Sequence, residues 1–199
     1  MLVANKFIDF TAPAILSNGE IVQNFNLSNY IKNKVSVLFF WPMNFTFVCP
    51  SELIAFDKRF FEFKNRNVKL VGVSLDTVYS HQAWRSTSTK LGGIGEVRYP
   101  MVSDIKRNIM KSYNVEHPEI GVALRASFLI DKAGIVRHQI INDLPIGRDI
   151  NEMIRVIDAL LFHEKHGEVC PAQWKKNREG IVPSREGISQ YLSENLNDL

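Results

Sequence analysis

The sequence is poor in cysteine, it contains no long apolar run, and its charges are nearly balanced. Cys49 and Cys170 are the only cysteines among its 199 residues. Two widely separated thiols argue against a framework of structural disulfides. No apolar stretch approaches the ~20 residues that a membrane-spanning helix needs, so no membrane partner is expected. The 24 basic residues are interleaved with 21 acidic ones, and the net charge of +3 argues against nucleic acid as a partner.

The composition favours a globular domain. A chain of 199 residues with 45% hydrophobic and 23% charged residues is long enough to bury a full core. The first residues lack the charged and then apolar pattern of a secretion signal, so a cytoplasmic protein is expected. Internal repeats and linkers are absent from the sequence. We therefore predict one domain over residues 1–199, with a core over about 1–166 and a C-terminal arm over about 167–199.

Three apolar runs rich in β-branched and aromatic residues indicate buried strands, at residues 35–40, 68–73 and 126–130. Residues 131–134, Asp-Lys-Ala-Gly, are typical of a turn, and residues 135–141 indicate a returning strand. Such a hairpin makes two neighbouring strands antiparallel. The sheet is therefore predicted to be mixed.

One helix is predicted to begin at Cys49, between the first two strands. Pro50 and Glu52 both suit a first helical turn. Apolar side chains then recur at helical spacing, at Leu53, Phe56, Phe60 and Phe63. We interpret these residues as a single helix.

A second helix is predicted near the end of the chain. Asp149 with Glu152 three residues later is a typical start, and Gly167 a typical end. Between them runs an apolar stripe of Ile150, Met153, Ile154, Ile157, Leu160 and Leu161. Weaker patterns indicate helices over residues 79–87 and, with Ser103 and Asp104 as a possible cap, over 105–113.

The alternation of strands and helices predicts an α/β fold, with a central mixed sheet flanked by helices. From Pro171 onward the composition becomes polar, and residues 175–180 include three basic side chains. This segment indicates an extended, mobile C-terminal tail that carries Cys170 at its root.

Cys49 is the first candidate for chemistry because it stands at a helix start. Unpaired N–H groups and the helix dipole favour an anion there, so a thiol tends to be held as thiolate. Lowering a thiol pKa from ~8.5 to ~6 gains about thirtyfold in thiolate, but weaker nucleophilicity cancels about 10- to 18-fold. Any large acceleration must come from donors that stabilise the leaving group. The alternative is an inert core cysteine.

Thr46 and Arg125 are the candidate donors. Thr46 stands three residues before Cys49, and its hydroxyl can donate and accept; alternatively, it bonds only its own turn. Arg125 enters a buried strand, where a charge is costly without an anionic partner, and a thiolate would supply one. An exposed position just outside the strand is the open alternative for Arg125.

Taken together, these residues resemble a typical two-cysteine peroxiredoxin, close to the bacterial alkyl hydroperoxide reductase C group, over nearly the whole chain. The family signature Pro-x-x-x-Thr/Ser-x-x-Cys stands here as Pro42, Thr46 and Cys49. The segment of the family's resolving cysteine matches residues 166–174, His-Gly-Glu-Val-Cys-Pro-Ala-Gln-Trp, which contain Cys170.

Further matches supply supporting residues. The family's later arginine corresponds to Arg125, and Glu52, Trp84 and Arg148 match as well. In the family, the glutamate and the second arginine orient the active-site arginine. The resemblance therefore implies the same roles for Glu52 and Arg148.

The resemblance implies a thioredoxin-like fold and a thiol-dependent peroxidase acting on hydrogen peroxide and organic hydroperoxides. The Cys49 thiolate would become a sulfenic acid while Thr46 and Arg125 hold the peroxide and Pro42 shields the pocket. Cys170 of a partner subunit would then form an intermolecular disulfide, which thioredoxin or a flavoprotein disulfide reductase reopens. A homodimer, assembled as a decamer of five dimers, is also implied, with no cofactor and no metal.

Disulfide formation makes a mechanical demand on this arrangement. The two Cα atoms of a disulfide lie within about 7 Å of each other, and a thiolate fixed at a helix start cannot reach a tail cysteine. We therefore expect the first turn after Cys49 to unwind and the Cys170 segment to move.

A few positions depart from the family pattern. Asn44 stands where aspartate is usual and Ser51 where threonine is usual, and we expect little change because both remain polar. Residues 92–95, Gly-Gly-Ile-Gly, resemble a motif of overoxidation-sensitive members, but their terminal Tyr-Phe pair is here Tyr191-Leu192. A smaller anchor should cover the active-site helix less firmly, so intermediate or low sensitivity to sulfinic acid formation is expected.

Other functions are considered beside this one. A thioredoxin-type exchanger is disfavoured because Glu52 stands where the second cysteine of Cys-x-x-Cys would be. A chaperone (holdase) or peroxide-signalling scaffold built on the same oligomer stays open. His163, His166 and Cys170 could be drawn as a metal site, but cations at a helix C-terminus are the ordinary explanation.

Overall fold

The computed structural model describes residues 1–196, so the last three residues of the predicted C-terminal arm lie outside the described residues. The chain divides into two compact units, one over Met1–Ile150 and one from Asn151 onward. The dividing point lies at the start of a long helix. The organisation as one domain with an arm from about residue 167 stays a prediction.

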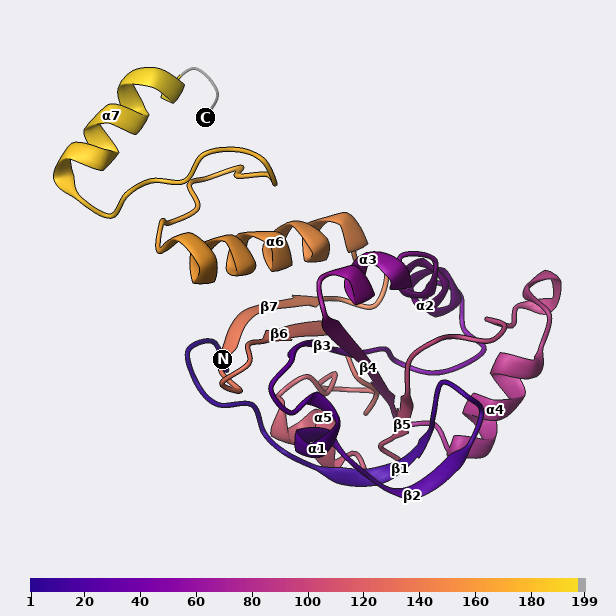
Figure 1. Cartoon of the computed structure of the whole chain (residues 1–199). Helices are drawn as coiled ribbons and strands as arrows, with labels where there is room; N and C mark the ends of the chain where they lie inside the picture. The colour runs from indigo at the N-terminus through magenta and orange to yellow at the C-terminus, as the bar shows by residue number, and fades with distance from the viewer. Residues whose placement is uncertain (197–199) are drawn as a thin grey trace. The chain divides into compact units, whose positions relative to one another are not determined.

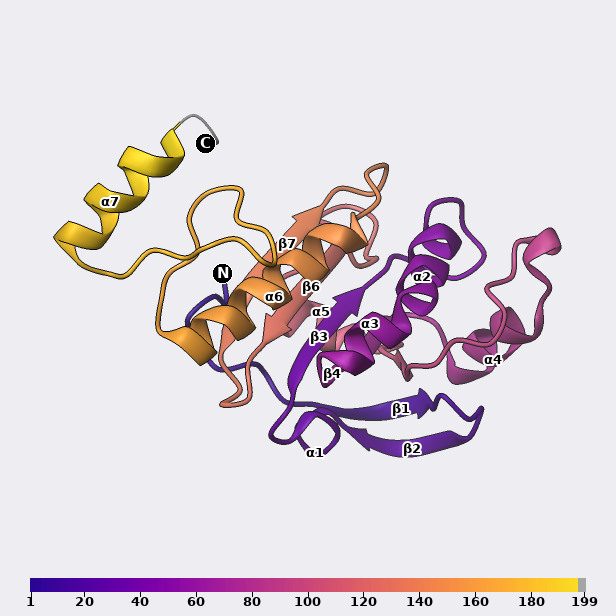
Figure 2. The same cartoon turned by 45° about the horizontal axis from the view of Figure 1, so that its top comes forward.

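A seven-stranded sheet forms the centre of the first unit (Figures 1 and 2). Its strands are β1 (Thr11–Ile15), β2 (Ile21–Asn26), β3 (Val35–Phe40), β4 (Val68–Ser74), β5 (Met101–Ser103), β6 (Arg125–Ile130) and β7 (Val136–Asn142). Their order across the sheet is β2-β1-β5-β4-β3-β6-β7. β4 is parallel to β3 and β5, and all other neighbours are antiparallel, which confirms the predicted mixed sheet.

The hairpin of β1 and β2 closes one edge of the sheet, and the sequence patterns did not indicate it. β1 contains Pro13, which is unusual inside a strand, and β2 exposes Gln23 and Asn24 in succession. The strands pair antiparallel, with Thr11 opposite Asn26. Backbone pairing therefore builds this edge without an apolar pattern in the sequence.

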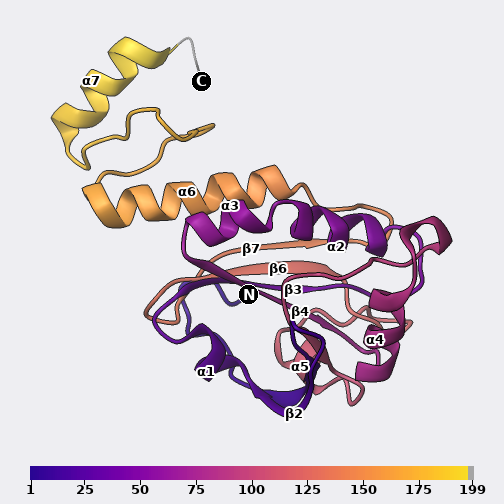
Figure 3. The same ribbon diagram turned by 45° about the vertical axis from the view of Figure 1, so that its right-hand side comes forward.

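Helices cover both faces of the sheet. They are α1 (Leu27–Ile31), α2 (Cys49–Lys58), α3 (Phe60–Asn65), α4 (Val78–Ser86) and α5 (Asn108–Ser112), with a 3-10 turn at Thr89–Leu91. α2 and α3 lie on one face of the sheet and α5 lies on the other, as Figures 1 and 3 both show. The sheet flanked by helices agrees with the predicted fold class.

The predicted single helix from Cys49 through Phe63 is wrong, because the chain leaves helical geometry at Arg59. There φ is −94° and ψ is 7°, and α3 starts at the next residue. The Arg59 guanidinium bonds to Glu62 across the break. Phe56 and Phe63 still pack together, with ring centroids 6.0 Å apart. The regular apolar spacing arises because α2 and α3 pack against the same part of the core, although they are two separate helices.

The helix predicted over residues 105–113 is shorter than expected. Arg107 has φ of 58°, in the left-handed region, so α5 begins only at Asn108. The predicted cap residue nevertheless serves the helix, since the carboxylate of Asp104 accepts hydrogen bonds from the N–H groups of Ile109 and Met110 at 3.0 and 2.8 Å.

β3 is buried along its whole length, and alternate side chains build two packing layers. The Phe39 ring stacks on Phe56 of α2, with centroids 4.2 Å apart. Phe40 instead packs with Tyr113 and Phe128, at 5.4 and 6.0 Å. Packing on both faces explains why this strand is apolar except at Ser36, and it gives the following loop a fixed starting point.

The second unit begins at the second residue of α6 (Ile150–His166) and continues through a loop to α7 (Arg185–Asn195). Gly167 follows α6 with φ of 73°, as expected for a helix end. In the loop, Val169 pairs with Ile181 as an isolated bridge. The predicted tail is therefore not extended throughout. Within residues 1–196, none of the helices is long and apolar enough to cross a membrane.

Candidate active site

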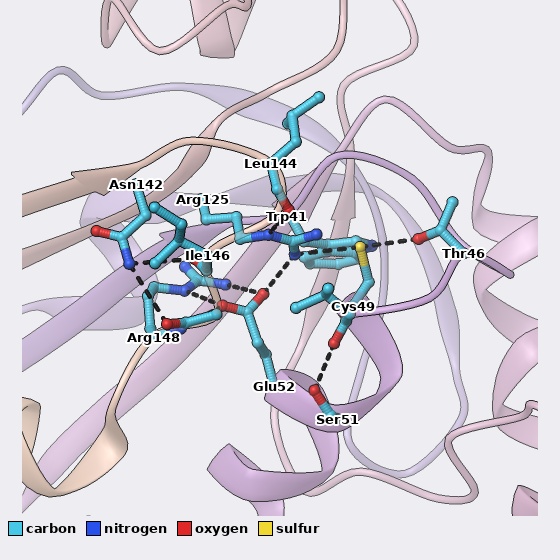
Figure 4. A network of polar contacts seen from close by, with 12 residues as sticks. Trp41, Thr46, Cys49, Ser51, Glu52, Arg125, Asn142, Leu144, Ile146 and Arg148 are labelled. Atoms are coloured by element: carbon cyan, nitrogen blue, oxygen red, sulfur yellow. Dashed lines mark hydrogen bonds and ion pairs between the residues drawn. The ribbon is translucent and has the colours of Figure 1, made fainter.

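Cys49 is the first residue of α2, as predicted, and it follows directly on the loop that leaves β3. The residue is fully buried. Its sulfur is not surrounded by hydrocarbon alone, because the Thr46 hydroxyl lies 2.9 Å and an Arg125 guanidinium nitrogen 3.4 Å from Sγ (Figure 4). These two polar contacts separate Cys49 from an inert core thiol.

Strand pairing brings Arg125 to the sulfur. β3 and β6 are antiparallel, with Phe39 opposite Ser127, so the first residue of β6 lies beside the end of β3. Arg125 is 3% exposed, and its Nε donates to the Leu144 carbonyl oxygen at 2.6 Å. The exposed position that the sequence left open for Arg125 is therefore excluded.

Glu52, in the first turn of α2, binds both arginines of the site. Its Oε2 accepts from NH1 of Arg125 at 2.8 Å and from NH2 of Arg148 at 2.9 Å. Its Oε1 accepts from Nε and from the backbone N–H of Arg148, at 2.8 and 2.9 Å. Each carboxylate oxygen thus has two donors, and the carboxylate holds the Arg125 head beside Cys49 (Figure 4).

The balance of charge in this cluster favours an anion at the sulfur. Burial by itself raises the pKa of Glu52, but the charge and hydrogen bonds of Arg148, together with Arg125, outweigh it and hold that pKa below its ordinary value. Glu52 is therefore ionised at neutral pH. Two guanidinium groups and one carboxylate leave one positive charge uncompensated, and a thiolate at Cys49 would neutralise it.

Arg148 is held on all sides. Besides its bonds to Glu52, its NH1 donates to the Ala126 carbonyl oxygen at 2.6 Å and to Ser127 Oγ at 3.1 Å. The guanidinium carbon also lies 5.6 Å from the Phe39 ring centroid and 5.7 Å from that of Phe56, within cation–π range. The second arginine is thus fixed by β6 and by the aromatic layer between β3 and α2.

The Thr46 hydroxyl has one proton and two acceptors within reach. The Met43 carbonyl oxygen lies 2.8 Å and Cys49 Sγ lies 2.9 Å from Oγ1. Because a hydroxyl donates one hydrogen bond at a time, a thiolate at Cys49 competes with the Met43 carbonyl for that proton. Both uses considered from the sequence, a turn hydroxyl and a donor to the sulfur, are therefore geometrically available to Thr46.

Pro42 and Trp84 stand apart from this network. Pro42 is buried, two residues beyond the end of β3, and its role as a shield stays a prediction. Trp84 is fully buried in α4, where its indole N–H donates to the Gly92 carbonyl oxygen at 2.9 Å. Its ring lies 5.8 Å from that of Phe45, between centroids, so it touches the active-site loop and not the sulfur cluster.

Cys170 lies in the second unit, on the loop after α6, and it is half-buried. Its sulfur is 3.5 Å from the Ala159 carbonyl oxygen. Burial raises the pKa of the Cys170 thiol; Arg155 opposes this shift and Glu168 adds to it. At neutral pH, Cys170 is therefore mainly a thiol.

The three side chains considered as metal ligands have other contacts. His163 Nδ1 lies 2.8 Å from the Glu168 carbonyl oxygen, and the His166 ring lies 4.6 Å from that of Phe162, between centroids. Across residues 1–196, no group of three His, Cys, Asp or Glu side chains is placed to hold a metal ion.

Sequence reasoning missed several parts of the site. The carbonyl oxygens of Leu144 and Ala126 orient the two arginines, and a backbone acceptor leaves no trace in residue type. The buried partnership of Asn44 with His81 was also missed, although the departure of Asn44 from the family pattern was a signal that could have drawn attention to it.

Comparisons with known proteins agree on one family. Residues 3–139 match the AhpC/TSA family, and residues 159–194 match the C-terminal domain of 1-Cys peroxiredoxin. Alkyl hydroperoxide reductase C of Buchnera aphidicola subsp. Acyrthosiphon pisum is 61% identical over 194 residues, 98% of each chain. The Helicobacter pylori protein of that name is 49% identical over 195 residues, again 98% of each. The crystal structure of reduced Plasmodium vivax 2-Cys peroxiredoxin superposes with a TM-score of 0.93, at 45% identity over 97% of this chain and 99% of that one.

Proposed function

The chain belongs to the AhpC/TSA family of peroxiredoxins, and from this premise we propose that it reduces hydrogen peroxide and organic hydroperoxides through Cys49. The Cys49 thiolate attacks the terminal oxygen of the hydroperoxide. An S–O bond forms and the O–O bond breaks, the leaving oxygen takes the electron pair and a proton, and water or an alcohol departs. The sulfur is oxidised to a sulfenic acid and the peroxide is reduced.

The position of the sulfur between Arg125 and Thr46 carries this proposal. Arg125 points a guanidinium nitrogen at the sulfur, and Thr46 offers it a hydroxyl, at 3.4 and 2.9 Å. A peroxide that approaches the sulfur meets the same two donors, which are held in place before the reaction and can stabilise charge on the leaving oxygen. This is the leaving-group assistance that ionisation of the thiol alone does not supply.

In the second step we assign the resolving role to Cys170 of a partner subunit. Its thiol condenses with the Cys49 sulfenic acid, which forms an intermolecular disulfide and releases water. The buried sulfur of Cys49 must first become accessible, so the start of α2 unwinds. Ser51 N–H, Glu52 N–H and the Ser51 hydroxyl all donate to the Val48 carbonyl oxygen, so this first turn depends on one acceptor.

A disulfide reductase, thioredoxin or a flavoprotein, then supplies two electrons to reopen the disulfide.

We further propose a homodimer that assembles into a decamer of five dimers, in the cytoplasm. The active-site loop supports an assembled state because Met43, Phe45 and Phe47 are exposed there, with Phe47 at 96%. Exposed apolar side chains in a group are typical of interaction surfaces.

Peroxide treatment and non-reducing gel electrophoresis test the proposal. The wild type should consume peroxide and shift from monomer to disulfide-linked dimer, and Cys49→Ser should abolish both. Cys170→Ser should still consume one equivalent of peroxide but form no dimer band, which makes it the matched control. A wild type that consumes no peroxide, or a Cys49→Ser variant that turns over like wild type, would overturn the assignment.

A chaperone or signalling role on the same oligomer is the second candidate, and no contact among the described residues favours it over the peroxidase. Suppression of aggregation, measured on the wild type and on Cys49→Ser, would reveal a holdase. A holdase activity that survives the substitution would be independent of the chemistry at Cys49.

A further inference from the structure

Asn44 is a buried amide in the middle of the active-site loop, between Pro42 and Thr46. It is 4% exposed, and all of its polar side-chain atoms are bonded. Its Oδ1 accepts from the Trp41 indole N–H at 3.0 Å. Its Nδ2 bonds to Ser80 Oγ at 2.9 Å and to His81 Nδ1 at 3.1 Å. The amide therefore connects the loop to α4.

The proton positions along this chain of bonds follow from its two ends. An indole N–H only donates, so the amide atom that faces Trp41 is the oxygen, and the NH₂ group of Asn44 faces His81. His81 Nδ1 must then accept. At the other end, His81 Nε2 lies 3.2 Å from the Val102 carbonyl oxygen, which only accepts, so Nε2 carries the proton. The bonds to Asn44 and to Val102 together require a neutral His81 ring that carries its proton on Nε2.

The surroundings keep His81 neutral. Burial lowers its pKa to about 4; Asp76 opposes this shift, and Arg85 adds slightly to it. These are the charged groups that act on the ring, from the segment before α4 and from α4 itself. β5 presents the Val102 carbonyl, and the Trp41 ring packs 5.5 Å away, between centroids. At physiological pH, the His81 ring therefore does not change its charge.

The loop needs such an anchor because it contains a strained residue. Phe45, between Asn44 and Thr46, has φ of 54°, in the left-handed region that bulky side chains rarely adopt. Such a conformation persists only where the surrounding contacts hold it. Asn44 provides them on one side, where its backbone N–H also donates to Asp76 at 2.9 Å. Thr46, on the other side, bonds to Met43 and Cys49.

We propose that Asn44 is a positioning residue for the peroxidase reaction, and that its bond to neutral His81 fixes the Phe45 turn and thereby the Thr46 hydroxyl against the Cys49 sulfur. This role rests on the proposed function of Cys49. Because neither member of the pair changes charge near neutral pH, the anchor is unchanged across that range. The family's usual aspartate could not do this with the same tautomer, since a carboxylate has no hydrogen to donate to Nδ1. The expectation from the sequence that Asn44 in place of aspartate changes little is therefore revised under this proposal, because the direction of the bond to His81 depends on the amide.

The substitution Asn44→Asp tests this directly. A carboxylate at position 44 accepts from Trp41, but it requires a proton on Nδ1 of His81, and its charge raises the His81 pKa. Below that pKa both ring nitrogens donate, one to the carboxylate and one to the Val102 carbonyl oxygen. Above it a single ring proton is left for these two acceptors, so one of the two hydrogen bonds is lost and the anchor weakens as the pH rises. The rate of Cys49 oxidation relative to wild type should therefore fall by about tenfold or more between about pH 5 and about pH 9, because a small displacement of a reacting group is costly.

Two matched variants serve as controls. Asn18→Asp adds the same charge on an exposed turn and should leave the relative rate constant with pH. Asn44→Asp combined with His81→Asn replaces the titrating ring by an amide that donates to the carboxylate, so the relative rate should again be flat. All four proteins also carry Cys170→Ser, so that only Cys49 reacts, and thermal unfolding is measured on each.

A relative rate for Asn44→Asp that is constant with pH would overturn the inference, even if the variant is less stable. A merely structural role would lower the rate by the same factor at every pH. A pH-dependent ratio that survives in the double variant would overturn it as well. Alkylation of Cys49 by iodoacetamide, followed over the same pH range, needs no peroxide. If the wild type reduced no peroxide, the proposed function would fail, while the alkylation profile would still decide the role of Asn44.

Discussion

Cys49 and Cys170 occupy opposite kinds of surroundings. Cys49 is fully buried, beside a hydroxyl and a guanidinium that belongs to a cluster with one positive charge in excess. Cys170 is half-buried on a loop, 3.5 Å from a carbonyl oxygen, and its pKa is raised. One thiol lies beside two hydrogen-bond donors, and the other lies where burial raises its pKa.

Under the proposed function, these surroundings suit the two thiols to different steps of one reaction. A nucleophile that meets a small substrate benefits from a rigid site with fixed donors, because their reorganisation is already complete. In the proposed second step, Cys170 must reach a sulfur that is at first buried, and a half-buried position on a loop suits that role. The comparison predicts that changes around Cys49 have large effects and that changes around Cys170 have small ones.

The largest effect is expected for Arg125→Met. The substitution keeps the length of the side chain but removes the donor at the sulfur, and loss of one such donor costs about 10²- to 10³-fold in rate. Stopped-flow measurement of Cys49 oxidation would check this. Arg185→Met, exposed on α7, is the matched control and should react like wild type. A fall of less than about tenfold for Arg125→Met would mean that its charge is not used in the reaction.

A large effect on stability is expected for Glu52→Gln. Removal of the carboxylate leaves two buried guanidinium groups unpaired, and breaking a buried pair in this way costs about 3–5 kcal/mol. Denaturant unfolding of the reduced protein measures the free energy. Glu62→Gln, which breaks the surface pair with Arg59, should cost at most about 1 kcal/mol. Equal costs for the two variants would contradict the central role of Glu52.

Acid titration sharpens the same test. The pKa of Glu52 is lowered in the folded protein, so its contribution to stability is full above its unfolded pKa of about 4.3 and is lost as the pH falls through the folded value. Glu52→Gln should lack this part of the acid dependence. The difference in unfolding free energy between wild type and variant should therefore shrink as the pH is lowered below about 4.

The smallest effect is expected for Glu168→Gln in the other region. Glu168 contributes to the raised pKa of Cys170, so its neutralisation should lower that pKa and raise the thiolate fraction at pH 7, by about twofold. Alkylation of Cys170 against pH, in a Cys49→Ser background, measures the shift. Glu164→Gln, on the exposed end of α6, is the control. The assignment would be refuted if Glu164→Gln lowered the pKa of Cys170 more than Glu168→Gln does.

Much of the fold follows from the sequence because its central strands are buried on both faces. β3, β4 and β6 are rich in apolar residues and are buried along almost their whole length, and the hairpin of β6 and β7 contains a recognisable turn. β1 and β2 could not be predicted, since backbone pairing holds them and Pro13 interrupts the pattern. The break at Arg59 was missed because apolar spacing continues across it.

The candidate site shows the same division. The spacing of Pro42, Thr46 and Cys49 is visible in the sequence, because these residues are close along the chain. The approach of Arg125 depends on the register of two antiparallel strands, which no local pattern contains. The role of Asn44 could not be predicted either, since its partner His81 belongs to another element and the direction of their hydrogen bond depends on Trp41 and Val102.

The interruption between α2 and α3 has a consequence for how far disorder can spread. Helix melting is cooperative only within one uninterrupted run of hydrogen bonds. α2 contains ten residues and ends at Lys58, and Phe63 is anchored in the core from the separate helix α3. Unwinding that starts at Cys49 is therefore limited to the ten residues of α2, because the chain already leaves helical geometry at Arg59. The proposed unwinding at Cys49 would then leave Phe63 of α3 packed in the core.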